Sequence, residues 1–390
     1  MLPEQPLDRR PLDAGSAAVN QHDETKAFFG GSSQILVHHG EHLVRPKGVQ
    51  IQFVADNIEP IILLIVGGAL ANDVHGKNHH VAGTFGHHVR AFELLRSDGS
   101  RLRCSLDENH EWFAATLGGL GLTGLVTWVE LQLRRIPGPA MEVESLRFGT
   151  LDEFFALSRE SAATHEYTVA WIDCLARGAS LGRGHFLRAD HSAAPAPSPP
   201  RRVLAMPLLP PLSLVNRLTL RPFNSLYFHR QRRARQRATL HYAPYFYPLD
   251  GIAHWKRMYG PRGFLQHQCV IPPAAARDAV AQMLEEIARS GSGSFLAVLK
   301  EFGPRPSPGL LSFARPGTTL ALDFPNEGAP TFDLLQRLDA IVAAAGGAIY
   351  AAKDARMSAA TFRAGYPRLD QFRRFVDPRF SSGLWRRVME

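Results

Sequence analysis

The chain has 390 residues, 45% of them hydrophobic and 21% charged, which is typical of a globular protein and not of a disordered or fibrous one. Because this length exceeds what one hydrophobic core usually supports, we expect two domains. The formal net charge of +8 permits attraction to polyanions, an anionic membrane or a phosphorylated substrate, and it says nothing of the fold.

The cysteines and the hydropathy pattern argue against further classes of protein. Cys104, Cys174 and Cys269 are odd in number and lack metal-like spacing, so we interpret them as small buried residues and not as disulfide partners or zinc ligands. The N-terminus lacks the apolar stretch of a secretory signal. The longest apolar run, 61–71, is shorter than the roughly 20 residues that span a bilayer. We expect a protein that is cytoplasmic or peripheral at the inner membrane.

Breaker residues divide the first part of the chain. Residues 1–60 are weakly patterned, and from 61 to 138 short apolar runs alternate with glycine turns. Residues 90–103 predict a strand, a turn at an Asp-Gly pair and a second strand. A further alternating run over 127–136 predicts a strand that stops at a Pro-Gly-Pro sequence. We place a domain boundary at that sequence.

A second unit is predicted over residues 139–347. Its last part, 332–347, has apolar residues at helical spacing and ends in a glycine pair, as a helix with a glycine C-terminus does. Within the unit, 191–213 is rich in proline, alanine and serine and predicts a loop. The remainder, 348–390, returns to apolar and aromatic patterning.

The segment 66–90 carries the strongest chemical signal, because it places glycines and five histidines around Lys77. Glycines let a ligand approach the backbone closely, and imidazoles with an ammonium offer donors to an anion or a flavin ring. A nucleotide cofactor is therefore our first hypothesis.

The histidines of this segment, His75, His79, His80, His87 and His88, also invite a metal interpretation. Adjacent side chains on a strand point apart, so His79 and His80 would not share one ion, and the segment offers no carboxylate at ligand spacing. We therefore predict no metal site. A set of structural histidines remains the alternative to ligand contacts.

Residues 119–124 match the G-x-G-x-x-G pattern of nicotinamide-binding Rossmann domains. That site needs a strand before the glycines and a helix after them, so that the pyrophosphate meets a helix N-terminus. Here 109–117 predicts a helix before the glycines and 125–133 predicts a strand after them. The order argues against a Rossmann domain and leaves a tight turn, or a different nucleotide fold.

Several blocks together resemble one family. They are GGALANDVHGKNHH at 67–80, FAATLGGLGLTGL at 113–125, AWID at 170–173, YGPRGFLQHQCVIP at 259–272, DFP at 323–325 and YAAKDAR at 350–356. In this order they resemble FAD-dependent oxidases of the vanillyl-alcohol-oxidase type, and most closely the decaprenylphosphoryl-ribose 2′-oxidase group. The resemblance covers residues 66–390.

The resemblance implies a two-domain α+β fold of the PCMH type with non-covalent FAD. Residues 61–138 would form the second half of the FAD domain, 139–347 the substrate or cap domain, and 348–390 a return to the FAD domain. In residues 1–60 the nearest substitute for the family's strand and Gly-rich loop is GGSS at 30–33, preceded by AFF and followed by ILV. Nothing else there is of the family kind, so we expect an atypical or truncated N-terminal segment and weak FAD retention.

The resemblance also assigns site residues. It implies that Lys353, Lys77 and Tyr350 are catalytic, with Tyr350 near the flavin and Lys77 facing the substrate. The implied cofactor contacts are Val66, Gly67, Gly68, Asn72, Asp73, His75, Gly76, Gly119, Gly121, Val126 and Tyr350, and the implied substrate contacts are Lys77, Trp171, Gln268, Lys300, Ala321 and Lys353.

These assignments have plainer alternatives. By themselves, Lys353 and Asp354 could be a surface pair in a turn, and Trp171 and Gln268 could be core residues. On a regular strand, Tyr350 and Lys353 would point to opposite sides, so an irregular strand end is needed to bring them together. Ala321 stands where mycobacterial members carry a cysteine, which changes the shape of the pocket.

The implied activity is oxidation of the 2′-hydroxyl of a polyprenyl-phosphate pentose to a ketone, for cell-wall arabinose synthesis. A short-chain reductase partner would complete the epimerisation. The alternatives are a soluble aldonolactone or alditol oxidase of the same fold, and a non-catalytic remnant without flavin.

The run 229–237 reads HRQRRARQR. Such a run can bind phosphate or dock peripherally on an anionic membrane, and a solvated basic helix face is the alternative. Nucleic acid is not an expected partner, because the run lacks interleaved aromatics and a recognisable module.

Overall fold

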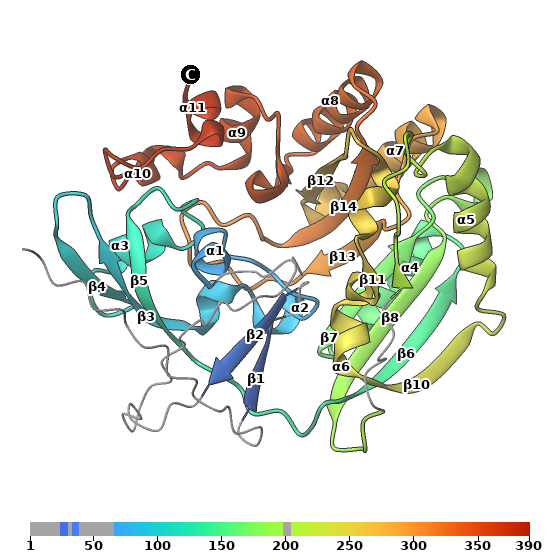
Figure 1. The fold of residues 1–390 in the computed structure, drawn as a ribbon, viewed down its shortest axis with the longest axis horizontal. Coiled ribbons are helices and arrows are strands. Elements are labelled where there is room, and N and C mark those ends of the chain that lie inside the picture. The colour runs from blue at the N-terminus through green and yellow to red at the C-terminus, as the bar shows by residue number, and fades with distance from the viewer. Residues whose placement is uncertain (1–23, 30–32, 39–65, 198–203) are drawn as a thin grey trace, which may run out of the picture.

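The computed structural model describes the backbone of Glu24–Phe29 and Ser33–His38, and residues 66–197 and 204–390. The first two segments are strands β1 and β2, which pair antiparallel. The remainder of the atypical segment predicted for 1–60 lies outside the described residues. Helices and sheets are mixed along the chain (Figure 1), which confirms the α+β class.

A three-stranded sheet forms the first region, in the order β4-β3-β5. Its strands are β3 (Val89–Leu95), β4 (Arg101–Ser105) and β5 (Leu125–Leu131). The predicted strand–turn–strand is confirmed, since β3 and β4 pair antiparallel. Phe92 of β3 stacks on Phe113 of α3 (His110–Thr116), with ring centroids 5.4 Å apart. Because α3 precedes the G-x-G-x-x-G glycines and β5 follows them, the predicted order that argues against a Rossmann site is confirmed.

An eight-stranded antiparallel sheet begins directly after the Pro-Gly-Pro sequence at 137–139. Its strand order is β10-β6-β8-β7-β13-β14-β12-β15. In chain order the strands are β6 (Ala140–Phe148), β7 (Tyr167–Ile172), β8 (Gly184–Ser192), β10 (Arg235–His241), β12 (Phe264–Ile271), β13 (Val298–Phe302), β14 (Gly317–Pro325) and β15 (Ala348–Ile349).

The larger hydrophobic core lies between this sheet and its helices α4 (Leu151–Ala162), α7 (Pro273–Ser290) and α8 (Ala329–Ala344). The predicted helix at 332–347 corresponds to α8, which begins three residues earlier and ends before Gly346, whose φ is +66°. A glycine at that point adopts the left-handed conformation without strain.

Short elements connect these layers. The helices are α1 (Val66–Ala71), α2 (His79–Ala82), α5 (Arg217–His229) and α6 (Tyr242–Phe246), and the 3₁₀ turns are η1 (Phe85–His88), η2 (Gly178–Ser180), η3 (Pro248–Gly251), η4 (Trp255–Tyr259) and η5 (Ala351–Lys353). Strand β9 (Leu204–Ala205) pairs parallel with β11 (Ile252–Ala253). Among the described residues, no helix is long and apolar enough to cross a membrane.

The C-terminal helices α9 (Ala359–Gly365), α10 (Leu369–Arg373) and α11 (Gly383–Met389) link the two regions. Helix α9 packs on α8 and β15. Farther along, the Asp377 amide donates to the Leu122 carbonyl at 2.8 Å, and the Asp377 carboxylate accepts from the Ser97 amide at 2.9 Å. The segment therefore contacts the first region as well as the large sheet. The domain divisions themselves stay a prediction.

Gly119 is required by packing, because a Cβ there would lie 2.2 Å from the Ala115 carbonyl oxygen. We predict that Gly119→Ala lowers the free energy of unfolding by about 1–3 kcal/mol, as overpacking does. Gly383→Ala is the matched control, since its Cβ would meet nothing within 4 Å. Urea unfolding of both variants checks this, and equal midpoints would contradict the packing argument.

Candidate active site

One face of the large sheet gathers four of the expected substrate residues. Four residues form one row across neighbouring strands. Gln268 of β12 pairs with Ala321 of β14, and Ala321 pairs with Val298 of β13. Val298 in turn pairs with Trp171 of β7. Directly opposed residues of antiparallel strands point to the same side. Lys300 is two residues beyond Val298 and therefore shares this side. The alternate residues of these strands, such as Leu299 and Leu320, belong to the core under α7 and α8.

The glycine–histidine segment lies against this face through His75. Its Nε2 is 3.0 Å from the Gln268 amide nitrogen, and its Nδ1 is 3.3 Å from the Lys300 ammonium. Lys300 also donates to the Gly76 carbonyl. The His75 ring meets the edge of Phe302, with centroids 4.6 Å apart. Burial and the neighbouring Lys300 charge hold the pKa of His75 well below its usual value, so the imidazole is neutral at pH 7.

Asp73 fixes the shape of the same segment. It has a positive φ of +40°, and its carboxylate accepts from the Gly86 amide at 2.7 Å and from the Ser312 hydroxyl at 2.5 Å. Burial raises the pKa of this carboxyl, and the hydrogen bonds oppose that shift. Both carboxylate oxygens thus have partners within the protein, which gives Asp73 a structural role in the segment.

Tyr350 reaches the segment from the opposite side. Its ring stacks on Phe313, with centroids 4.4 Å apart, and its hydroxyl donates to the Asn72 carbonyl at 3.4 Å. Strand β15 ends at Ile349, and η5 (Ala351–Lys353) follows at once. The irregular strand end that the sequence required is therefore present, and Lys353 interacts electrostatically with His75 and Lys300.

Three lysines concentrate positive charge at this place. Burial lowers the pKa of Lys77 to about 7. Burial and the charges of Lys77 and Lys353 lower the pKa of Lys300 to about 7. Burial also lowers the pKa of Lys353, and the charge of Asp323 opposes this shift. A buried lysine with so few negative charges nearby tends to lose its proton or to bind an anionic ligand.

Lys77 is held by α6. Its ammonium donates to the Tyr245 carbonyl and lies 4.3 Å from the centroid of the Tyr245 ring. The backbone carbonyl of Lys77 accepts from the Thr168 amide of β7 at 3.0 Å. This lysine therefore stands between the sheet face and α6.

Two buried polar atoms beside the lysines lack hydrogen-bond partners within the described residues. They are Oε1 of Gln268 and Nε2 of His79. Leaving a buried polar atom without a partner costs about 1–3 kcal/mol. Such atoms are expected where a ligand supplies the missing partner.

The expectation that His79 and His80 lie on a strand is wrong, because they form the first turn of α2. The two rings nevertheless have separate partners. Nδ1 of His79 accepts from the Gly303 amide at 3.2 Å, and Nε2 of His80 lies 2.9 Å from the His165 carbonyl. His87 lies 3.0 Å from the Pro306 carbonyl. These three rings serve different structural contacts.

The two glycine-rich segments meet away from the lysines. The Gly118 amide donates to the Leu70 carbonyl at 2.9 Å, which places the 118–121 turn beside α1. A Cβ at Gly67, Gly68 or Gly121 would meet nothing within 4 Å, so no described residue fills the space beside the backbone there. The neighbouring Val66 is buried in the small core, and Val126 packs against that core from β5. At Gly119, by contrast, neighbouring atoms occupy the space that a side chain would need.

Sequence reasoning missed several neighbours of the lysines. Asp323 lies on the Gln268 side of β14, where its carboxylate accepts from the Gln266 amide at 2.8 Å. Thr319 accepts from the Gln268 amide at 3.0 Å. The alternation Thr319, Ala321, Asp323 along one strand was the signal that could have found both. Trp171 shares the face, and its indole donates to the Phe295 carbonyl at 2.9 Å.

Comparison with known proteins identifies the family. Over 340 aligned residues the chain is 36% identical to the decaprenylphosphoryl-beta-D-ribose oxidase of Mycolicibacterium smegmatis. The alignment covers 83% of this chain and 73% of that protein. The chain belongs to the decaprenylphosphoryl-ribose oxidase family. It is accordingly an oxidoreductase. A second relative, the "uncharacterized protein in mprA 5′ region" of Streptomyces coelicolor, is 38% identical over 345 residues, or 83% of this chain and 92% of that one. No family model matches the chain.

The buried lysines predict a pH dependence of stability. Their pKa values fall from 10.5 in the unfolded chain to about 7 in the folded protein for Lys77 and Lys300. The unfolded chain therefore binds more protons above pH 7, and stability must rise with pH in that window. We expect the unfolding temperature of the flavin-free protein to rise between about pH 7 and 8.5.

Differential scanning fluorimetry checks this expectation. Lys300→Met should reduce the slope of unfolding temperature against pH, whereas Lys256→Met, which removes an exposed lysine, should leave the slope unchanged. A slope that is identical in all three proteins would show that the buried lysines do not titrate in this range.

Proposed function

We propose that this protein binds FAD non-covalently in a PCMH-type fold and oxidises a secondary alcohol of a sugar to a ketone. The observation that supports the proposal is the set of three buried lysines beside two unpartnered polar atoms, one on Gln268 of the sheet face and one on His79 of α2. Membership of the decaprenylphosphoryl-ribose oxidase family favours the 2′-hydroxyl of a polyprenyl-phosphate pentose as the reacting group.

The residues fit a flavin. The open backbone at Gly67, Gly68 and Gly121 suits the close approach of a dinucleotide. Toward the sheet, His75 and Gly76 would contact the flavin ring, and Tyr350 would lie beside it. When bound, FAD would supply the acceptor for the hydride that leaves the carbinol carbon of the sugar.

Lys353 is proposed to hold the reacting hydroxyl and to take its proton. The lowered pKa of this lysine increases the fraction of neutral amine that can accept a proton near neutrality. Lys77 and Lys300 would orient the sugar and compensate a phosphate, because both ammonium groups are buried with little opposing charge. Ala321 and Trp171 would form the wall beside the sugar.

The product ketone is proposed to pass to a short-chain reductase that completes the epimerisation in cell-wall arabinose synthesis. This step requires a partner because oxidation alone gives a ketone, and the new configuration at the 2′-carbon is set only when that ketone is reduced. The proposed substrate carries both a phosphate and a polyprenyl chain, so the pocket must accept an anion next to an apolar tail.

We predict that Lys353→Met retains bound flavin but loses substrate-driven flavin bleaching by roughly 10²–10⁴ in rate. The reason is that methionine keeps most of the side-chain volume and removes the proton acceptor. Anaerobic stopped-flow absorbance with a polyprenyl-phosphoryl ribose measures the rate, and Lys256→Met serves as the exposed-lysine control.

Unchanged bleaching in Lys353→Met would remove this lysine from the mechanism. Bleaching of the unmodified protein by a free aldonolactone or alditol, but not by the phosphoryl ribose, would favour the soluble-sugar oxidase instead.

A further inference from the structure

An exposed apolar surface lies on α5 and on the chain before it. Of the twelve large hydrophobic residues exposed in the described chain, eight fall between Leu204 and Leu226. They are Leu204, Leu208, Leu209, Leu212, Leu214, Leu218, Phe223 and Leu226. We call this set the leucine surface. A soluble monomer seldom concentrates its exposed large apolar side chains in this way without a binding role.

The leucine surface is held in place by ordered backbone. The Met206 amide donates to the Ala253 carbonyl at 2.9 Å, and the Leu214 amide donates to the Met258 carbonyl at 2.7 Å. The Arg257 guanidinium donates to the Met206 carbonyl at 3.1 Å. These contacts fix the backbone of 204–214 while its leucines remain exposed.

Helix α5 continues the surface. Leu218, Pro222 and Leu226 are spaced four residues apart and therefore share one face of the helix. All three are exposed, whereas Leu220 and Asn224 on the other side are buried. In Figure 1, α5 lies at the outer edge of the molecule.

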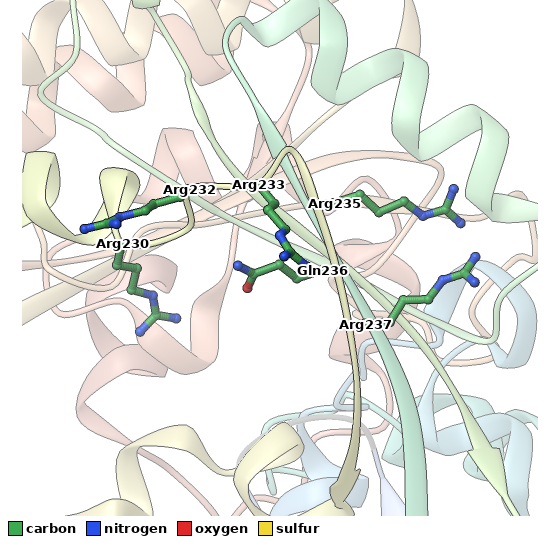
Figure 2. Close-up of a pocket in the computed structure, with 6 residues that line it drawn as sticks. All are labelled: Arg230, Arg232, Arg233, Arg235, Gln236 and Arg237. Atoms are coloured by element: carbon green, nitrogen blue, oxygen red, sulfur yellow. The ribbon is translucent and has the colours of Figure 1, made fainter.

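The charge of this region has one sign. Residues 191–249 contain nine arginines and no aspartate, glutamate or lysine. Five of the arginines line a hollow formed by the turn after α5 and by β10 (Figure 2). The alternative of a solvated basic helix face over 229–237 does not hold, because α5 ends at His229 and β10 begins at Arg235.

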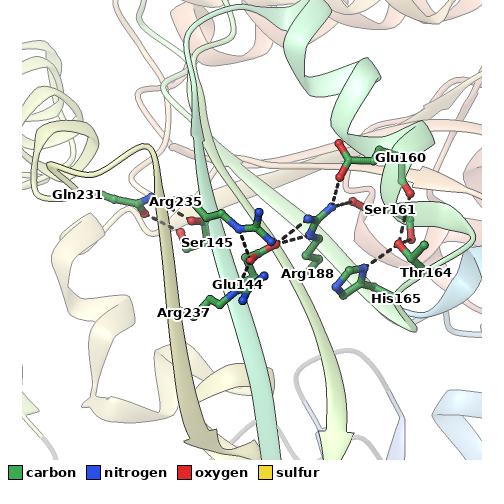
Figure 3. Close-up of polar contacts among 10 residues, drawn as sticks. All are labelled: Glu144, Ser145, Glu160, Ser161, Thr164, His165, Arg188, Gln231, Arg235 and Arg237. Atoms are coloured by element: carbon green, nitrogen blue, oxygen red, sulfur yellow. Dashed lines mark hydrogen bonds and ion pairs between the residues drawn. The ribbon is translucent and has the colours of Figure 1, made fainter.

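Two of these arginines are already paired. Arg235 and Arg237 converge on Glu144, which also accepts from Arg188 at 2.7 Å (Figure 3). Burial acts to raise the pKa of Glu144, but the three arginines outweigh it and lower this pKa to about 2. Arg232 and Arg233 have no ion pair within the described part of the chain and are exposed.

We propose that the leucine surface and the adjacent Arg232 and Arg233 dock the protein on an anionic phospholipid bilayer. Leucines would enter the acyl boundary while the arginines meet lipid phosphates, as in interfacial amphipathic helices. The surface is connected to the element that holds Lys77, since β9 pairs with β11, which follows α6 and η3 in the chain, and the Tyr245 carbonyl of α6 accepts from Lys77. Docking there would bring a lipid-linked sugar to the pocket, although docking itself requires no flavin chemistry.

Cosedimentation with vesicles of phosphatidylglycerol and phosphatidylcholine tests the proposal. The full chain should bind these vesicles, bind pure phosphatidylcholine far less, and dissociate as salt rises. Arg232→Gln with Arg233→Gln should lower the partition coefficient by roughly fivefold for each arginine. Arg101→Gln with Arg103→Gln, at exposed positions of β4, is the charge-matched control and should bind as the unmodified protein does.

A second pair of variants tests the apolar part. Leu226→Ser, at a position that is 74% exposed, should lower binding by roughly tenfold, whereas Leu106→Ser, at a position that is 70% exposed in the first region, should not. Absence of vesicle binding at low salt would overturn the proposal, and so would equal losses in the control variants. A dimer that is lost in Leu226→Ser without vesicle binding would assign the surface to a second copy of the chain instead.

Discussion

The contact between Lys300 and the Gly76 backbone joins the two parts of the candidate site. Lys300 stands on β13 of the large sheet, and its ammonium reaches the carbonyl of Gly76 and Nδ1 of His75 in the glycine–histidine segment. A buried ammonium is tolerated only where polar groups surround it. The sheet face and the segment are thereby held together, and each carries one buried polar atom that lacks a partner among the described residues, Oε1 of Gln268 and Nε2 of His79.

The electrostatics of this junction limit what it can bind. Lys77, Lys300 and Lys353 are desolvated, and the Asp323 carboxylate offsets part of the charge of Lys353. Without a ligand, the lysines shift toward their neutral forms. With a phosphate or an electron-rich ring nearby, the charged forms are favoured again. The same lysines can thus bind an anion and exchange a proton near neutral pH.

Local sequence patterns predicted the elements better than the site. The helix α8 and the β3–β4 pair follow from apolar spacing and turn residues, which act over a few positions. The site depends on contacts between distant residues, such as the hydrogen bond between Ser312 and Asp73, 239 positions apart. The register of the strands pairs Gln268 with Ala321, and Ala321 with Val298. No single segment of the sequence encodes this register. The resemblance to a family supplied Trp171 and Gln268 where the residues alone favoured core positions.

The absorption spectrum of the purified protein, recorded before and after acid precipitation, tests the central claim most directly. The account predicts flavin absorbance in the native protein, partial as purified because FAD is weakly retained and increased when FAD is added, and its complete transfer to the acid supernatant as FAD because no covalent bond holds it. A colourless protein that takes up no flavin when FAD is added would contradict the account, and would leave the buried lysines to another anionic ligand.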